Sequence, residues 1–187
     1  KFVGEETTAE IGDNNMIREN VTISRGTASK GTTIVGSNNL LMENSHIGHD
    51  SIVGSGCIIG NSTKIAGEVT IHDYAILSAC VLVHQFSNIG SYVMIQGGSR
   101  LNKDVPPYII VGREPARYSG LNIIGLRRRG FSNETIKSIH EAYREIYESG
   151  TIVSTAVARI KEKGNITPEV EYILNFIEKI SERGIIG

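Results

Sequence analysis

The chain has 187 residues, and 19 lysines and arginines against 20 aspartates and glutamates give it a formal net charge of −1 at pH 7. This balance lacks the basic excess with which proteins attract nucleic acids or anionic membrane surfaces. Two cysteines, Cys57 and Cys80, do not form a disulfide framework, and no apolar run approaches the ~20 residues of a membrane-spanning helix. We therefore expect a soluble protein of the reducing cytoplasm, without nucleic-acid partners or stable membrane insertion.

The first residues predict a loop followed by a faint repeat. Residues 1–10 are polar and irregular, and Lys1 stands in the middle of a pattern, so we expect further coils upstream that are missing here. Isoleucines then recur every six residues at Ile11, Ile17 and Ile23. Ser29 breaks this series within the small, polar stretch 27–33, which predicts a loop bulging from one corner of the repeat. Insertions of this kind often form the walls of binding sites.

From Val35 to Pro106 a period of six dominates the sequence. Twelve consecutive blocks open on a branched aliphatic residue: Val35, Leu41, Ile47, Val53, Ile59, Ile65, Ile71, Leu77, Val83, Ile89, Ile95 and Leu101. A helix repeats its apolar positions every 3.6 residues and an ordinary strand every 2, so neither explains this period. The pattern is typical of a hexapeptide β-solenoid, in which each block makes a short strand and a corner. Three blocks per coil place residues eighteen apart one above the other, in coils ~4.8 Å apart.

The chain therefore divides into four predicted parts. After the loop of residues 1–10, the all-β solenoid occupies residues 11–106. Residues 107–131, rich in glycine and proline, predict a connector. Residues 132–187 predict an α-helical domain, whose simplest role is to cover the strand edges at the open end of the solenoid.

Helix start and stop signals divide this last domain into three helices. Ser132 is a candidate N-cap for a first helix, which Gly150 ends. A second helix is expected at about 152–163. A third begins after Thr167, another candidate N-cap, with a proline in its first turn.

The histidines carry the chemical interpretation. His49 is the third residue of its block, so it should point outward from a corner, and the eighteen-residue rule places Gly67 and then Gln85 along the same corner, with His84 beside Gln85. A neutral imidazole can remove a proton from an attacking hydroxyl. A neighbouring glycine leaves its backbone N–H open to an oxyanion, so the corner is a plausible acyl-transfer site. The alternative is that these are ordinary surface histidines.

A metal site is the second alternative. Some hexapeptide solenoids bind zinc between subunits through three histidines, as in γ-class carbonic anhydrases. His46 and His49 stand three residues apart, but on a solenoid two side chains at this spacing do not necessarily converge as they would on a helix. Both cysteines look structural, and we expect no metal.

Several motifs resemble the acyl-ACP:UDP-N-acetylglucosamine O-acyltransferase family over the whole chain. They are NLLMENSHIGHDSIVGSGCIIGNSTKIAGEVTIHDYA, VHQF, DVPPY, GLNIIGLRRRGFS and AYREIYESG. The resemblance implies a homotrimer of left-handed parallel β-helices with active sites in clefts between subunits. It also implies transfer of an (R)-3-hydroxyacyl chain from acyl carrier protein to the 3-hydroxyl of UDP-N-acetylglucosamine. This is the first step of bacterial lipid A biosynthesis and uses no metal or other cofactor.

The resemblance also assigns roles to single residues. It implies that His49 is the general base, that Asp50 orients it and that the Gly67 N–H stabilises the oxyanion. Gly97 would be the floor of the groove that measures the acyl chain, and a glycine there predicts long 3-hydroxyacyl donors. Positions that match substrate contacts are Lys1, His46, His84, Gln85, Asn122, Arg128 and Arg129. Guanidinium groups suit phosphate, but residues 127–129 also read as a solvated turn before a helix.

Three positions depart from the family pattern. Glu68 and Ser24 stand where family members carry histidine, and Ile124 stands where an acidic residue often contacts the ligand. Other interpretations remain: an N-acyltransferase of the same pathway, a CoA-dependent acetyltransferase, or a zinc-binding or non-catalytic solenoid. The helical tail after LRRRG argues against the first two.

Overall fold

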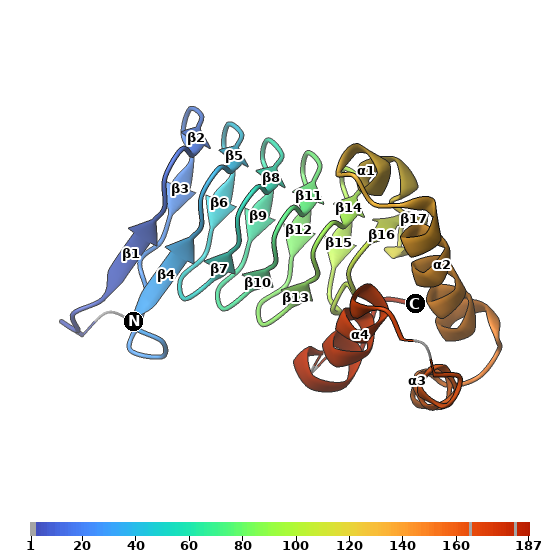
Figure 1. The fold of residues 1–187 in the computed structure, drawn as a ribbon. Helices are drawn as coiled ribbons and strands as arrows, with labels where there is room; N and C mark the ends of the chain where they lie inside the picture. The colour runs from blue at the N-terminus through green and yellow to red at the C-terminus, as the bar shows by residue number, and fades with distance from the viewer. Residues whose placement is uncertain (1–2, 165, 182) are drawn as a thin grey trace.

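The computed structural model describes residues 3–164, 166–181 and 183–187, and shows strands stacked in coils along one axis with helices at one end (Figure 1). The described residues form three sheets, here named A, B and C. Sheet A consists of β1 (Thr8–Ile11), β4 (Thr32–Val35), β7 (Ile52–Val53), β10 (Thr70–Ile71) and β13 (Asn88–Ile89). Sheet B consists of β2 (Met16–Ile17), β5 (Leu40–Leu41), β8 (Ile58–Ile59), β11 (Ile76–Leu77), β14 (Met94–Ile95), β16 (Ile109–Gly112) and β17 (Arg117–Leu121). Sheet C consists of β3 (Thr22–Ile23), β6 (His46–Ile47), β9 (Lys64–Ile65), β12 (Leu82–Val83) and β15 (Arg100–Leu101).

The predicted solenoid is confirmed. Neighbouring coils pair in parallel, as β7 and β10 do through Ile52 and Thr70. The aliphatic residue that opens each block points inward, and Ile59, Ile65 and Leu77 are fully buried. Because every coil contributes one such residue to each sheet, the interior is a set of aliphatic stacks that hold the coils in register.

A second inward position carries small residues that bond to the next coil. Asn39 Oδ1 accepts a hydrogen bond of 2.7 Å from the Cys57 N–H, and Thr63 Oγ1 accepts one of 3.2 Å from the Val81 N–H. Both polar side chains are buried. These bonds satisfy groups that would otherwise be costly inside the solenoid.

The first coil is longer than the others. Its strands pair with an offset of 24 residues, as between Thr8 and Thr32, instead of 18. One extra block is therefore looped out between β3 and β4, in residues 24–31, here called the insertion loop. The predicted loop at 27–33 is correct in place but too long, because Thr32 already lies in β4. The predicted loop at 1–10 also ends early, since the exposed β1 begins at Thr8. β1 is held by backbone hydrogen bonds to β4 while its side chains are exposed. Residues 8–10 therefore carry no apolar pattern from which the strand could be predicted.

The predicted connector has more structure than expected. Residues 107–131 contain β16, β17 and the short helix α1 (Ile123–Arg128). β16 continues sheet B in parallel, whereas β17 turns back and pairs antiparallel with it. β16 pairs with β14 at an offset of 16 residues, between Ile95 and Val111, instead of 18, so the six-residue pattern ends although the sheet continues.

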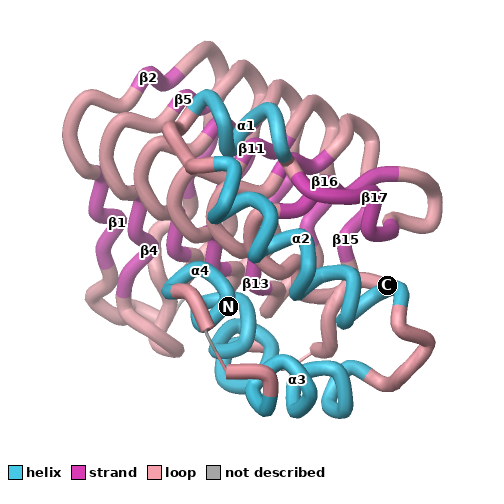
Figure 2. Tube along the Cα trace, turned by 45° about the vertical axis from the view of Figure 1, so that its right-hand side comes forward, coloured by secondary structure: helices cyan, strands magenta, loops and turns pink. Residues whose placement is uncertain are grey.

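The terminal helices cover one end of the solenoid. They are α2 (Asn133–Glu148), α3 (Val153–Glu162), α4 (Pro168–Asn175) and a π-helical segment η1 (Phe176–Ile180). Ser132 and Thr167 accept hydrogen bonds from the N–H groups of Thr135 and Val170, which confirms both predicted N-caps. α2 lies at the β16 and β17 end, away from β1, whereas α4 and η1 pack beside β13, where the Asn88 amide donates a 3.3 Å hydrogen bond to the Ile180 carbonyl (Figures 1 and 2). Tyr143 anchors α2 by donating a 2.6 Å hydrogen bond to the Pro107 carbonyl.

Candidate active site

His49 and Asp50 form a hydrogen-bonded pair at the corner between β6 and β7. His49 Nδ1 lies 2.8 Å from Asp50 Oδ2. Asp50 has a positive φ of 60°, a conformation that short polar side chains tolerate better than most. The Asp50 side chain is inaccessible, whereas 41% of the His49 side chain is exposed. The corner thus presents the imidazole to solvent while its partner stays inside.

The Asp50 carboxylate is held by three donors. Oδ1 accepts the Thr27 N–H at 2.8 Å, and Oδ2 accepts both the Thr27 hydroxyl at 2.5 Å and the His49 ring. Burial by itself would raise the pKa of this carboxyl, but the bonds from Thr27 and then His49 outweigh it, so the pKa lies below its usual value. Because Asp50 is ionised, it only accepts, and His49 must carry its proton on Nδ1. Nε2 is then free to act as a base.

Gly67 lies directly under the imidazole. A Cβ at this position would lie 2.5 Å from His49 Nε2, so any side chain here would displace the imidazole from its place. The Gly67 N–H makes no hydrogen bond to any other residue that the structure describes. A proton acceptor and an available backbone donor therefore stand side by side, as acyl transfer requires.

The eighteen-residue spacing places the remaining corner residues as predicted. The Glu68 N–H donates to the His49 carbonyl at 2.8 Å, and the Phe86 N–H donates to the Gly67 carbonyl at 3.3 Å. His49, Gly67 and Gln85 therefore follow one another along this corner. His84 is exposed beside Gln85, with Nδ1 3.0 Å from the Gln85 carbonyl oxygen.

His46 stands on the outer face of β6. Its Nδ1 lies 2.7 Å from the Thr22 hydroxyl. Burial, and to a lesser degree the neighbouring Lys64 cation, lowers the pKa of His46 below its ordinary value. A neutral ring at pH 7 can exchange hydrogen bonds with hydroxyl groups in either direction.

The insertion loop and His49 line a cavity of about 650 Å³. Its walls are Val3, Glu5, Ser24, Arg25, Gly26, Thr27, Ala28 and His49. The insertion thus forms the wall of a cavity at the corner that carries the proposed base.

Sequence reasoning missed two contacts of this loop. Thr27, described above, binds Asp50, and Lys30 Nζ lies 3.8 Å from Glu68 Oε2. Glu68 directly follows Gly67, so the loop is attached to two successive coils beside the site. The extra block of six residues indicated a loop at the corner of His49, but not which of its residues would contact Asp50 or Glu68.

Other predicted substrate residues lie at different corners. Asn122 and Arg129 lie at the corner between sheets A and B, where Asn122 donates a 2.9 Å hydrogen bond to the Tyr92 carbonyl and the Arg129 guanidinium lies 4.2 Å from the Tyr74 ring centroid. Asn122 Oδ1 also caps α1. Arg128 is exposed nearby. A single chain therefore does not bring these residues to His49.

Gly97 occupies the third corner, between β14 and β15, and Lys1 lies outside the described residues. The ruler position is thus also separate from His49 within one chain. The corner of Arg129 has its own cavity of about 510 Å³, lined by Asn14, Met16, Asn38, Asn39, Leu40, Ser55, Gly56, Cys57, Ile58, Tyr74 and Arg129.

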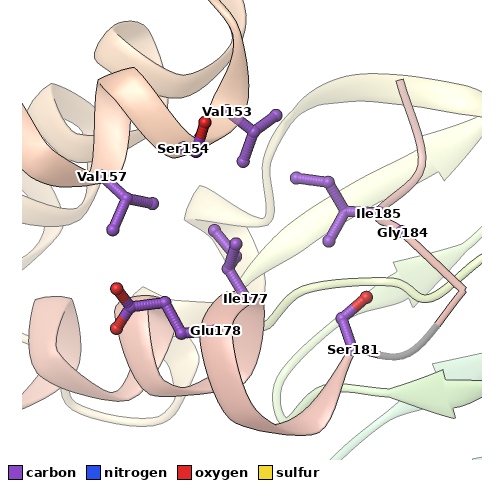
Figure 3. Close-up of a pocket in the computed structure, with 8 residues that line it drawn as sticks. All are labelled: Val153, Ser154, Val157, Ile177, Glu178, Ser181, Gly184 and Ile185. Carbon is purple, nitrogen blue, oxygen red and sulfur yellow. The ribbon is translucent and has the colours of Figure 1, made fainter.

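A further cavity, of about 500 Å³, lies among the terminal elements α3, η1 and the C-terminal tail (Figure 3). Its lining is mostly aliphatic, from Val153, Val157, Ile177 and Ile185, and includes no predicted site residue. Among the described residues, no group of three or more His, Cys, Asp or Glu side chains is arranged to hold a metal ion. No helix in the described ranges is long and apolar enough to cross a membrane.

Comparison with known proteins agrees with the motifs. Residues 104–186 match the family described as Udp N-acetylglucosamine O-acyltransferase, Domain 2, and residues 32–67 match the bacterial transferase hexapeptide family. An acyl-[acyl-carrier-protein]–UDP-N-acetylglucosamine O-acyltransferase of Pseudomonas paraeruginosa is 44% identical over 186 residues, which is 99% of this chain and 72% of the relative.

Solved structures give the same result. LpxA of Bacteroides fragilis, a UDP-N-acetylglucosamine acyltransferase, is 66% identical with a TM-score of 0.97, over 100% of this chain and 72% of that one. LpxA of Acinetobacter baumannii is 44% identical with a TM-score of 0.95, over the same shares.

Proposed function

The chain belongs to the UDP-N-acetylglucosamine O-acyltransferase family, and we propose that it transfers an (R)-3-hydroxyacyl chain from acyl carrier protein to the 3-hydroxyl of UDP-N-acetylglucosamine. This is the first step of lipid A biosynthesis, in the bacterial cytoplasm. The observation that carries the proposal is the packing of the Asp50-bound His49 ring on Gly67.

His49 and Gly67 account for both halves of the transfer. Nε2 of His49 removes the proton from the acceptor hydroxyl as its oxygen attacks the thioester carbonyl. The resulting oxyanion accepts a hydrogen bond from the Gly67 N–H. The tetrahedral intermediate collapses to the ester, the C–S bond breaks, and the leaving thiolate takes the proton from the imidazolium. Asp50 stabilises that imidazolium throughout.

The test is an acyl-transfer assay with defined acceptors and donors. We expect transfer from (R)-3-hydroxyacyl-acyl carrier protein to UDP-N-acetylglucosamine. Transfer to a glucosamine amine instead would indicate the N-acyltransferase, and transfer from acetyl-CoA alone would indicate an acetyltransferase.

A homotrimer would bring the three corners together. The outer face of sheet B carries an apolar column of Met16, Leu40, Ile58, Ile76, Met94 and Ile110. Met16 is 65% exposed, and such a continuous apolar surface favours contact with another chain. The separation of Arg129 from His49 in one chain further supports active sites built between neighbouring subunits.

Mixed trimers would test this arrangement. We expect His49→Ala and Arg128→Ala chains, co-expressed with different tags, to regain about a quarter of wild-type kcat/KM, since each site would take one residue from each of two subunits chosen at random. Light scattering should show three chains per particle. Activity equal to the average of the two homotrimers, or an active monomer, would contradict sites between subunits.

Arg128→Ala should weaken substrate binding more than folding. The side chain is exposed and belongs neither to the solenoid core nor to the buried face of α2, which is formed by Ile136, Ile139, Ala142, Tyr143 and Ile146. Loss of a charged hydrogen bond to phosphate should cost about 1.5–3 kcal/mol, seen as a higher KM with an unchanged melting temperature. Arg127→Ala, on the same exposed turn, is the control. An unchanged KM for donor and acceptor would show that Arg128 is a solvated surface residue that does not contact either substrate.

A further inference from the structure

The insertion loop contacts the catalytic corner at the buried Asp50 carboxylate, in addition to its ion pair with Glu68. Thr27 of this loop binds Asp50 through two donors, its N–H at 2.8 Å and its hydroxyl at 2.5 Å. The loop is itself held at its base, because the Gly31 N–H donates to the Thr27 carbonyl at 2.7 Å and the Gly26 N–H donates to the Thr8 carbonyl at 2.8 Å. Thr27 is thus fixed independently of Asp50.

One oxygen of Asp50 serves both Thr27 and His49. Oδ2 accepts the Thr27 hydroxyl and the His49 Nδ1–H, while the Asp50 N–H donates to Thr33 Oγ1 at 2.8 Å. The carboxylate plane is therefore set by the Thr27 pair of bonds, and the direction of Oδ2 sets the direction of the imidazole. Without the Thr27 hydroxyl the carboxylate could rotate, and His49 Nε2 would leave its place over Gly67.

Thr27 also borders the space beside the base. It lines the cavity of about 650 Å³ together with Ser24, Ala28 and His49. A ligand that contacts the loop would therefore act on the same residue that fixes Asp50.

From these contacts we infer that Thr27 is a positioning residue, whose hydroxyl holds Asp50 so that His49 Nε2 stays directed at the acceptor hydroxyl above Gly67. This inference rests on the proposed acyl transfer. The inference gives the insertion loop a role in catalysis. The other coils of the solenoid form without such an extra block.

Thr27→Val tests the inference, because valine keeps the branched shape and the backbone N–H but lacks the hydroxyl. We expect kcat to fall roughly 10- to 100-fold, with the acceptor KM within about twofold of wild type. Thr27→Ser should restore kcat to within about threefold. Thr32→Val, which removes a hydroxyl that bonds to Thr8 at the base of the same loop, is the matched control and should behave as wild type.

A second background separates positioning from a general structural role. In Asp50→Asn protein, Thr27→Val should change kcat by less than about twofold, since two residues that act through one interaction are not additive. The same loss in both backgrounds, a kcat within twofold of wild type, or a change in KM alone would overturn the inference. If Thr27→Val does not fold, Thr27→Ala carries the same expectations. Absence of transfer by the wild-type protein would instead refute the proposed function.

Discussion

His49→Ala should lower acyl transfer by about 10²-fold or more while leaving the solenoid intact, because a general base contributes this much to a proton-transfer step. The structure gives two reasons to expect an intact fold. The His49 side chain is 41% exposed, and the aliphatic stacks that hold the coils together lie on the other side of the backbone. The measurement is kcat with saturating donor and acceptor, together with the melting temperature.

His140→Ala provides the control for this change. His140 is an exposed histidine on α2, so its loss should leave both kcat and stability unchanged. If His49→Ala kept activity within a few-fold of wild type, the ring would be an ordinary surface histidine and the base would have to be sought elsewhere. His49→Gln, which keeps a hydrogen-bonding group without a base, should be as inactive as the alanine variant.

Gly97→Met should shift the preferred donor from long to shorter 3-hydroxyacyl chains. If the groove between subunits ends at Gly97, a methionine there fills the space of about four methylenes. At about 0.8 kcal/mol per buried methylene, this changes the selectivity between long and short donors by about two orders of magnitude. The measurement is kcat/KM over a donor series of increasing chain length, on both proteins.

The local backbone accepts this substitution. Gly97 is exposed, its φ is not in the left-handed region, and a Cβ would meet only the Ala79 carbonyl oxygen closely, at 3.1 Å. Gly98, in contrast, has a φ of +75°, in the left-handed region that glycine adopts most readily. Gly97→Ala should therefore keep the wild-type preference. An equal loss on all donors in Gly97→Met would show that the position serves the corner and not the acyl chain.

The repeat alone predicted most of the fold, because its physical cause is local. Every sixth side chain has to fill the same interior, so the positions of Val35 to Leu101 can be read without any contact information. The same rule placed Gly67 beside His49, since residues one coil apart must stack. Caps such as Ser132 and Thr167 were equally visible, because a cap bonds within its own helix.

Contacts made by segments outside the repeat could not be predicted from the sequence and are visible only in the tertiary structure. Thr27 reaches Asp50 across 23 residues, through a polar loop that carries no periodic signal. β17 turns back onto β16, and η1 follows α4, without any pattern that marks either change.

The proposed site residues also divide into those that the repeat places and those that it does not. The sequence determined that His49, Asp50 and Gly67 share one corner, because the six-residue period fixes corners within a coil. It grouped Asn122, Arg128, Arg129 and Gly97 with them only by resemblance. The tertiary structure placed these four at the two other corners, where the faces of one prism point in different directions. A chain whose repeat determines each face so strictly holds its own three corners apart, and this separation is the reason for the proposal that a neighbouring subunit completes the site.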